Sequence, residues 1–247
     1  MTDKHSTHAR RAFLGIAGAG LGAAALAPGL HLVQIAQAEG DHDAQGASPA
    51  VRWGMLIDTT QCAKGCDACV TACNTENAIN ESVPDARQAS QWIRKIDLKD
   101  PKNGREHSLP MMCQHCAKPP CVDVCPTGAS MKRADGIVLV DRHTCIGCRY
   151  CMMACPYKAR SFVHLPLTGQ NPEVPRGMGC VESCTFCVHR VDKGQQPACV
   201  EACPEGAMTF GDLNDPNSAI AQRLARESAT QVRADLRLDL GVRYQGI

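Results

Sequence analysis

Cysteine spacing constrains this chain more than any other feature of its sequence. The chain has 247 residues and 17 cysteines, and only Cys180 stands outside four groups of four. An odd number excludes complete pairing into disulfides. Aromatic residues are scarce (two Trp, three Tyr and four Phe), so we expect something besides an apolar core to stabilise the fold. In chain order the groups are Cys62, Cys66, Cys69 and Cys73; Cys113, Cys116, Cys121 and Cys125; Cys145, Cys148, Cys151 and Cys155; and Cys184, Cys187, Cys199 and Cys203.

The third group has the spacing of a ferredoxin cluster loop. Its Cys-x2-Cys-x2-Cys-x3-Cys-Pro run is the one that bacterial ferredoxins use for a cubane iron–sulfur cluster. Three closely spaced thiolates bind one cluster, and the fourth binds the other cluster of a pair. We expect the fourth cysteine to start a short helix, with the following proline fixing φ there. Proline follows Cys125, Cys155 and Cys203, whereas Asn74 follows Cys73.

Two other metal chemistries fit the cysteines less well. The fourth group, with its Cys-x2-Cys-x11-Cys-x3-Cys spacing, would pass for a zinc knuckle if it stood alone. The other three groups carry a third closely spaced cysteine that zinc sites do not require. Covalent haem needs Cys-x-x-Cys-His, and Val188 separates Cys187 from His189.

Residues 1–38 have the layout of a bacterial signal peptide. The pair Arg10-Arg11 precedes a weakly apolar stretch over residues 15–33, and Ala36-Gln37-Ala38 is a small-x-small cleavage pattern. The twin arginine predicts export of a folded, cofactor-loaded protein to the periplasm. The alternative is an uncleaved membrane anchor. No later stretch has about 18 consecutive apolar residues, so we expect no transmembrane helix after cleavage.

Hydrophobic alternation and turn residues predict an α+β fold with short strands. We expect two bacterial-ferredoxin-like units, each with two clusters, one inserted in the other, loop-rich and with short β-hairpins. Residues 39–104 form the first part of the outer unit and begin with a polar linker over 39–50. Residues 105–170 form the inserted unit, and 171–247 complete the outer one. Strands are expected at 53–58, 91–98, 130–132, 136–141, 159–163 and 207–211, a hairpin turn at 103–104, a surface loop at 165–179, a helix near 217–227 and an edge strand over 232–244.

The order of the four groups resembles that of the four-cluster iron–sulfur subunits of respiratory membrane oxidoreductases. The matching stretches lie at residues 53–58, 73–77, 184–190 and 197–204. The family includes subunits of polysulfide, tetrathionate and dimethyl sulfoxide reductases and of formate dehydrogenase. Residues 63–65 make the first spacing one residue longer than the commoner pattern. The resemblance implies four 4Fe–4S clusters and a crossed ligand scheme: Cys62, Cys66 and Cys69 with Cys203; Cys184, Cys187 and Cys199 with Cys73; Cys113, Cys116 and Cys121 with Cys155; and Cys145, Cys148 and Cys151 with Cys125.

Four clusters in one chain imply an electron relay and not an enzyme. No nucleophile elbow, phosphate loop or dinucleotide fingerprint is present. The net charge of +1 excludes nucleic-acid binding by bulk electrostatics. The resemblance implies a periplasmic subunit, peripheral on a membrane complex of sulfur metabolism, between a membrane-integral quinone-reactive subunit and a multihaem cytochrome c. The alternative partner is a molybdopterin catalytic subunit.

Several residues near the groups have two possible roles. Cys180 is either a spare loop thiol or a substitute ligand for Cys184. Arg149, Lys158, Arg190 and Lys193 would either raise cluster potentials or be solvated surface charges. His115 and His189 lie beside ligands, but the cysteine count is complete without them.

Overall fold

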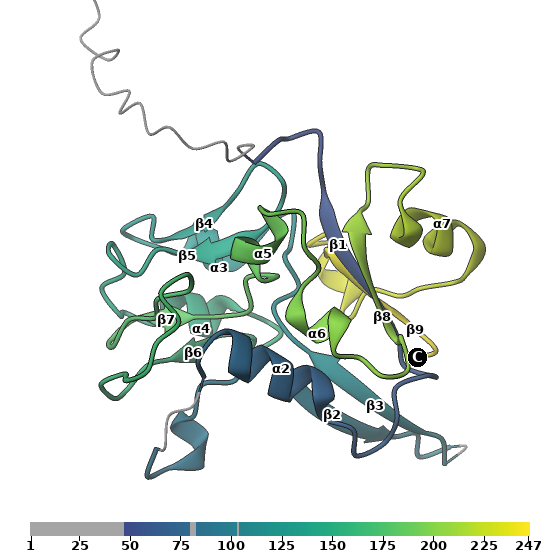
Figure 1. Cartoon of the computed structure of the whole chain (residues 1–247), viewed down its shortest axis with the longest axis horizontal. Coiled ribbons are helices and arrows are strands. Elements are labelled where there is room, and N and C mark those ends of the chain that lie inside the picture. Colours follow the sequence, from purple (N-terminus) through teal and green to yellow (C-terminus); the bar gives the residue numbers. More distant parts are fainter. Residues whose placement is uncertain (1–46, 80–82, 103) are drawn as a thin grey trace, which may run out of the picture. The chain divides into compact units, whose positions relative to one another are not determined.

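The largest sheet joins distant parts of the chain. The computed structural model describes residues 47–79, 83–102 and 104–247 (Figure 1). Strand β1 (Trp53–Asp58) lies at the centre, antiparallel to β8 (Met208–Asp212) and parallel to β9 (Val242–Gln245). Apart from half-buried Trp53, every β1 residue is buried. The sheet therefore ties the chain before the first cysteine group to the chain after the fourth.

Three two-stranded sheets accompany the larger one. Strand β2 (Arg94–Lys99) pairs with β3 (Glu106–Met111), and β4 (Ser130–Lys132) pairs with β5 (Val138–Val140). The third sheet joins β6 (Ser161–Phe162) to β7 (Val181–Glu182). All three pairs are antiparallel, as expected for strands joined by turns or short loops.

The helices are short because proline stops three of them. Helices α3 (Pro120–Asp123), α4 (Tyr150–Ala154) and α6 (Ala198–Glu201) all end one or two residues before a Cys-Pro pair. A residue before proline avoids the helical region, and Cys155 accordingly has an extended backbone (φ −74°, ψ 112°). Helix α2 (Ala68–Glu76) has Asn74 at that place and continues beyond Cys73. The expectation that the fourth cysteine starts a helix is therefore wrong. In the three Cys-Pro groups the helix carries the third cysteine and ends before the fourth, and in the first group α2 carries both.

The remaining helices of the described residues lie in the C-terminal part of the chain. Helix α5 (Val188–Val191) follows Cys187, whose backbone is left-handed. Helix α7 (Ala219–Arg226) packs against β8, and the Ser218 hydroxyl caps it by accepting from the Ala221 N–H. Two 3-10 turns cover Ala86–Gln88 and Ala234–Leu236.

Sequence patterns located most strands correctly. The strand at 53–58, the hairpin over 130–140 and the helix near 217–227 are confirmed, whereas β2, β5 and β6 are shorter than expected. The edge strand expected over 232–244 is wrong for its first ten residues, where left-handed backbone at Arg233, Arg237 and Asp239 interrupts the alternation. Only β9 at its end is a strand. Strand β3 was not predicted.

The fold agrees with the expected mixed α and β content, with small sheets and long loops. Helix α2 packs against α6, and α3 packs against α4. The predicted leader (1–38) and most of the linker (39–50) lie outside the described residues. Within the described ranges, no helix is long and apolar enough to cross a membrane.

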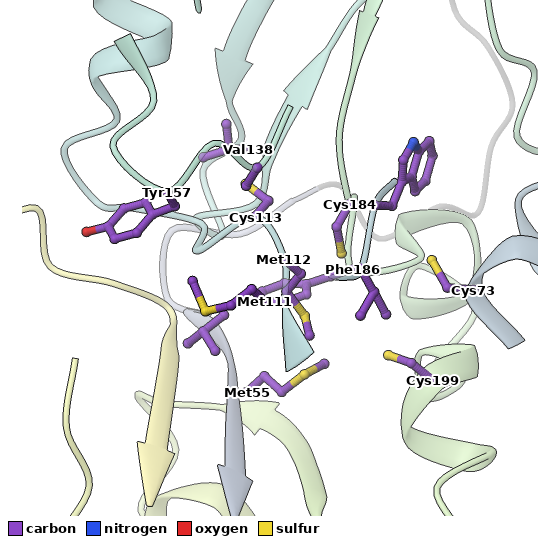
Figure 2. Close-up of a cluster of buried hydrophobic side chains, with 14 of the residues drawn as sticks. Met55, Cys73, Met111, Met112, Cys113, Val138, Tyr157, Cys184, Phe186 and Cys199 are labelled. Carbon is purple, nitrogen blue, oxygen red and sulfur yellow. The ribbon is translucent and has the colours of Figure 1, made fainter. Parts of the chain in front are cut away.

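Cysteines form much of the buried core. Nine of them join methionines, aromatic residues and aliphatic residues in one cluster of buried side chains. Figure 2 shows the sulfurs of Cys73, Cys184 and Cys199 facing a common space, with Met112 and Phe186 beside it. A core that is lined with thiols in this way suits a chain that binds sulfur-ligated cofactors.

Candidate iron–sulfur cluster sites

The structure gathers fifteen of the sixteen grouped cysteines into four sets, none of which is a single sequence group, and we assign Cys148 to the set of its loop neighbours Cys145 and Cys151. We call them sets A to D. Their members are Cys62, Cys66, Cys69 and Cys203 in set A; Cys73, Cys184, Cys187 and Cys199 in set B; Cys113, Cys116, Cys121 and Cys155 in set C; and Cys125, Cys145, Cys148 and Cys151 in set D. Each set takes three cysteines from one group and one from another.

Sets A and C each surround a small cavity. All four thiols of set A line one cavity, together with Lys95 and Met208. All four thiols of set C line another, together with Arg160 and Tyr157. Residues more than a hundred positions apart thus meet at set A, where Cys203 joins Cys62.

Sets B and D are identified by thiols that lie close enough to raise one another's pKa. Burial and the neighbouring thiols of Cys73, Cys199 and Cys187 raise the pKa of Cys184 well above its ordinary value. At set D, burial raises the pKa of Cys151, and Cys145 and Cys125 add to the effect. Cys148 lies in the loop between Cys145 and Cys151 and is exposed.

The thiols fit ligation of a cationic iron–sulfur core better than they fit free thiolates. Burial, with smaller contributions from neighbouring thiols, raises the pKa of Cys116 to about 12, and burial raises that of Cys113 to about 12. Four thiolates can be stable at such a site only when positive charge compensates them, as iron does. Among the described residues, every cysteine is free of disulfide bonds.

A zinc site in the fourth group does not agree with this arrangement. Cys203 lies with set A, whereas Cys184, Cys187 and Cys199 lie with Cys73 in set B. Moreover, no three His, Cys, Asp or Glu side chains in the described ranges lie close enough together to hold a single metal ion. The thiols of each set therefore surround a wider space than the tetrahedral site of one zinc ion.

The four sets form a row in the order A, B, C, D. The Cys69 thiol of set A is close enough to raise the pKa of Cys73 and of Cys199 in set B. In the same way, Cys151 of set D raises the pKa of Cys121 in set C. Between sets B and C, the ring of Phe186 stacks on His115 with centroids 3.6 Å apart. Each ring belongs to a Cys-x2-Cys loop, so the stack joins the two middle sets directly.

Two cations contact the thiols, and sequence reasoning missed both. Lys95 on β2 donates to Cys62 Sγ at 3.0 Å. Arg160 donates to Cys121 Sγ at 3.1 Å and to the Ser130 hydroxyl at 2.8 Å. These cations lie 33 and 39 residues from the thiols they contact, so no local sequence signal could reveal them.

The cations expected from sequence have other partners. Arg190 pairs with Glu76 and Glu201, and Lys193 pairs with Glu173. Arg149 lies over the Phe162 ring at 3.9 Å. Lys158 is exposed. For Arg149, Lys158 and Lys193 the interpretation as surface charges therefore agrees better with the structure, whereas the charge of Arg190 opposes the rise that burial causes in the pKa of Cys187.

The two histidines beside the ligands have roles of their own. His115 Nδ1 accepts from the Val138 N–H at 3.0 Å, and burial lowers its pKa to about 3. His189 Nε2 bonds to Glu76 at 2.8 Å. Each ring uses one nitrogen in this way, and among the described residues His115 Nε2 and His189 Nδ1 have no hydrogen-bond partner.

Cys180 is buried at the edge of set D. Its thiol donates to the Arg142 carbonyl at 3.2 Å. Among the neighbouring thiols, Cys145 raises the pKa of Cys180 most. Cys184 instead interacts with the thiols of set B. The structure therefore favours a spare loop thiol over a substitute for Cys184.

The sets define a ferredoxin-like protein that binds several iron–sulfur clusters, and comparisons with known proteins agree. Residues 106–213 match the family model described as a 4Fe-4S dicluster domain. The chain is 42% identical to the Hdr-like menaquinol oxidoreductase iron-sulfur subunit 1 of Archaeoglobus fulgidus, over 95% of this chain and 97% of the relative. It is 39% identical to a subunit of the tetrathionate reductase of Salmonella typhimurium, over 81% and 74% of the two chains, and 42% identical to protein NrfC of Escherichia coli, over 72% and 73%.

The chain belongs to this family of iron–sulfur electron-transfer subunits of oxidoreductases. Its cysteines fit four 4Fe–4S clusters. Members of the family transfer electrons and are not the catalytic subunits of their complexes. The expectations of a cluster-binding relay and of no catalytic role in this chain are therefore confirmed.

Proposed function

We propose that this chain relays single electrons along its row of four cysteine sets between two partner proteins. The observation that carries the proposal is the burial of the row. All eight thiols of the middle sets B and C are buried, whereas sets A and D each have three thiols that are at least partly exposed. Electrons can therefore enter and leave at the two ends only, with the middle shielded from water.

Each set would hold one cluster, with its four cysteines as ligands. A 4Fe–4S cluster supplies a one-electron acceptor whose potential depends on charge, hydrogen bonds to sulfur and solvent exposure. The packing of α2 on α6 and of α3 on α4 supports two ferredoxin-like units, one inserted in the other. Sets A and B belong to the outer unit, and sets C and D to the inserted one.

Both ends of the row have surfaces suited to partners. Near Cys148 of set D, the large apolar side chains of Ile146, Tyr150 and Met153 are more than half exposed. Near Cys62 of set A, a cavity of about 750 Å³ lies between the start of the first cysteine loop and the β2–β3 hairpin. Exposed apolar patches commonly mark protein interfaces, whereas the cavity near Cys62 is lined mainly by polar and charged side chains, so a different partner would bind at each end.

We infer that the complex is a membrane quinone-linked one of sulfur metabolism. In such a complex, of the DsrMKJOP type with this chain in the place of DsrO, one partner is a membrane-integral quinone-reactive subunit and the other a multihaem cytochrome c. The similarity to the menaquinol oxidoreductase protein supports this, because it extends over nearly the whole of both chains. The tetrathionate reductase and NrfC relatives match over less of this chain.

The second candidate is a relay for a molybdopterin catalytic subunit. The identity of 39% to a tetrathionate reductase subunit favours it. Purification of the native complex, followed by assays for haem c and molybdenum, separates the two. Haem c without molybdenum is expected; molybdenum without haem would contradict the first candidate. A brown chain with roughly sixteen iron and sixteen sulfide per chain is expected in both cases.

We also propose that the chain is exported to the periplasm by the twin-arginine route and lies peripherally on its membrane complex. The pair Arg10-Arg11 in the leader supports this. Replacing both arginines by lysine should leave a cluster-loaded protein in the cytoplasm, as cell fractionation would show. Unchanged export of that variant would refute the twin-arginine route.

A further inference from the structure

Arg160 is a buried cation without a carboxylate partner. Its residue is 6% exposed, and in the described part of the chain no Asp or Glu forms an ion pair with it. Nη2 donates to Cys121 Sγ and to the Ser130 hydroxyl, whereas Nη1 has no hydrogen-bond partner among the described residues. Buried charges in proteins are paired or bind metals, so a negative partner is missing here.

The position of Arg160 indicates what that partner is. Arg160 lines the cavity that the four thiols of set C surround. It also donates to the Ser130 hydroxyl, and the Ser130 N–H donates to Cys125 Sγ of set D at 3.3 Å. One guanidinium thus contacts set C directly and is linked to set D through Ser130.

We propose that Arg160 is a positioning residue shared by the clusters of sets C and D, and that it raises the reduction potentials of both. Its guanidinium would hold Cys121 of set C directly and Cys125 of set D through Ser130, and Nη1 would be the donor left for the cluster of set C. One-electron reduction adds one negative charge to a cluster, and a fixed cation stabilises that form. The proposal rests on the proposed ligand sets but not on the identity of any partner protein.

The outer unit provides an internal comparison. Lys95 donates to Cys62 of set A. The thiols that raise the pKa of Lys95 all belong to that set: Cys62, Cys69 and Cys66. At set B, a neutral amide donates instead, from Asn77 to Cys73 Sγ at 3.6 Å. Lys95 should therefore affect one cluster and Arg160 two.

Redox titration of the cluster-loaded full chain, followed by EPR, tests the proposal. Arg160→Gln should lower two of the four potentials by at least a tenfold change in the reduction equilibrium, about 59 mV for one electron. Arg160→Lys keeps the positive charge but loses the paired N–H donors of the guanidinium. It should lower the same two potentials by less. Lys95→Gln should lower one other potential, and Arg226→Gln, at the exposed surface of α7, should move none.

Iron content and a labelling experiment keep the result interpretable. Four unchanged potentials in a fully iron-loaded Arg160→Gln protein would overturn the proposal, as would an equal shift of all four. If the variants lose iron, ¹⁵N-arginine labelling of the unmodified chain decides the matter. Pulsed EPR of the reduced protein should then detect a ¹⁵N coupling at two clusters, and the lack of any coupling would refute the role of Arg160.

Discussion

The middle and the ends of the row of cysteine sets differ in how deeply their thiols are buried and in the side chains that pack between them. Sets B and C are entirely buried and are joined by the stack of Phe186 on His115. Sets A and D include thiols that reach the surface, with Cys148 the most open. The same ligand chemistry thus serves two purposes. In the middle it replaces a conventional apolar core, and at the ends it places redox centres where partners can approach.

Cysteine substitutions should separate the two regions most strongly. We expect Cys184→Ser in set B to lose its cluster and to lower the free energy of unfolding by roughly 3 kcal/mol or more, because a core position loses both ligand and packing. Cys148→Ser at the exposed end should cost much less. Iron per chain and anaerobic thermal unfolding measure both effects. If the two variants lowered the free energy of unfolding equally, burial would not explain how much each set contributes to stability.

Controlled cluster damage gives a second comparison. With limited ferricyanide under anaerobic conditions, the end sets should lose iron first, because oxidants and solvent reach their thiols. Alkylation of the released thiols, read by mass spectrometry, should label Cys148 and Cys62 before Cys184 and Cys199. Early labelling of the set B cysteines would contradict the burial pattern.

A cap far from the clusters should have a moderate and purely structural effect. The Ser218 hydroxyl accepts from the Ala221 N–H at the start of α7. Ser218→Ala should therefore lower the free energy of unfolding by about 1 kcal/mol without moving any cluster potential. Thermal unfolding and EPR titration of the same sample check this. A shifted potential would show that α7 is coupled to the clusters.

The smallest effect is expected at Cys180. Its thiol donates to a backbone carbonyl, and a serine hydroxyl can replace that bond. Cys180→Ser should keep all four clusters and change the free energy of unfolding by less than about 1 kcal/mol. A chain with only three clusters would instead identify Cys180 as a ligand.

Local sequence predicted the parts of the fold that depend on near neighbours. The strand at 53–58 and the hairpin over 130–140 follow from alternation and from turn residues, and the structure has them. The prediction of helices at the fourth cysteines failed because proline restricts the residue before it as well as itself. The prediction of a strand over residues 232–241 failed because several residues there have a left-handed backbone, which interrupts a strand and which the sequence pattern does not reveal.

The sequence by itself determined the ligand chemistry: sixteen thiols at cluster spacing, three Cys-Pro pairs and one cysteine outside the groups. Only the tertiary structure decided that Cys203 lies with Cys62, that the middle sets are buried and the end sets open, and that Lys95 and Arg160 lie against the thiols. The physical reason is distance along the chain. Spacing within a loop is set by local backbone geometry, whereas a contact between residues far apart in sequence depends on how the whole chain packs.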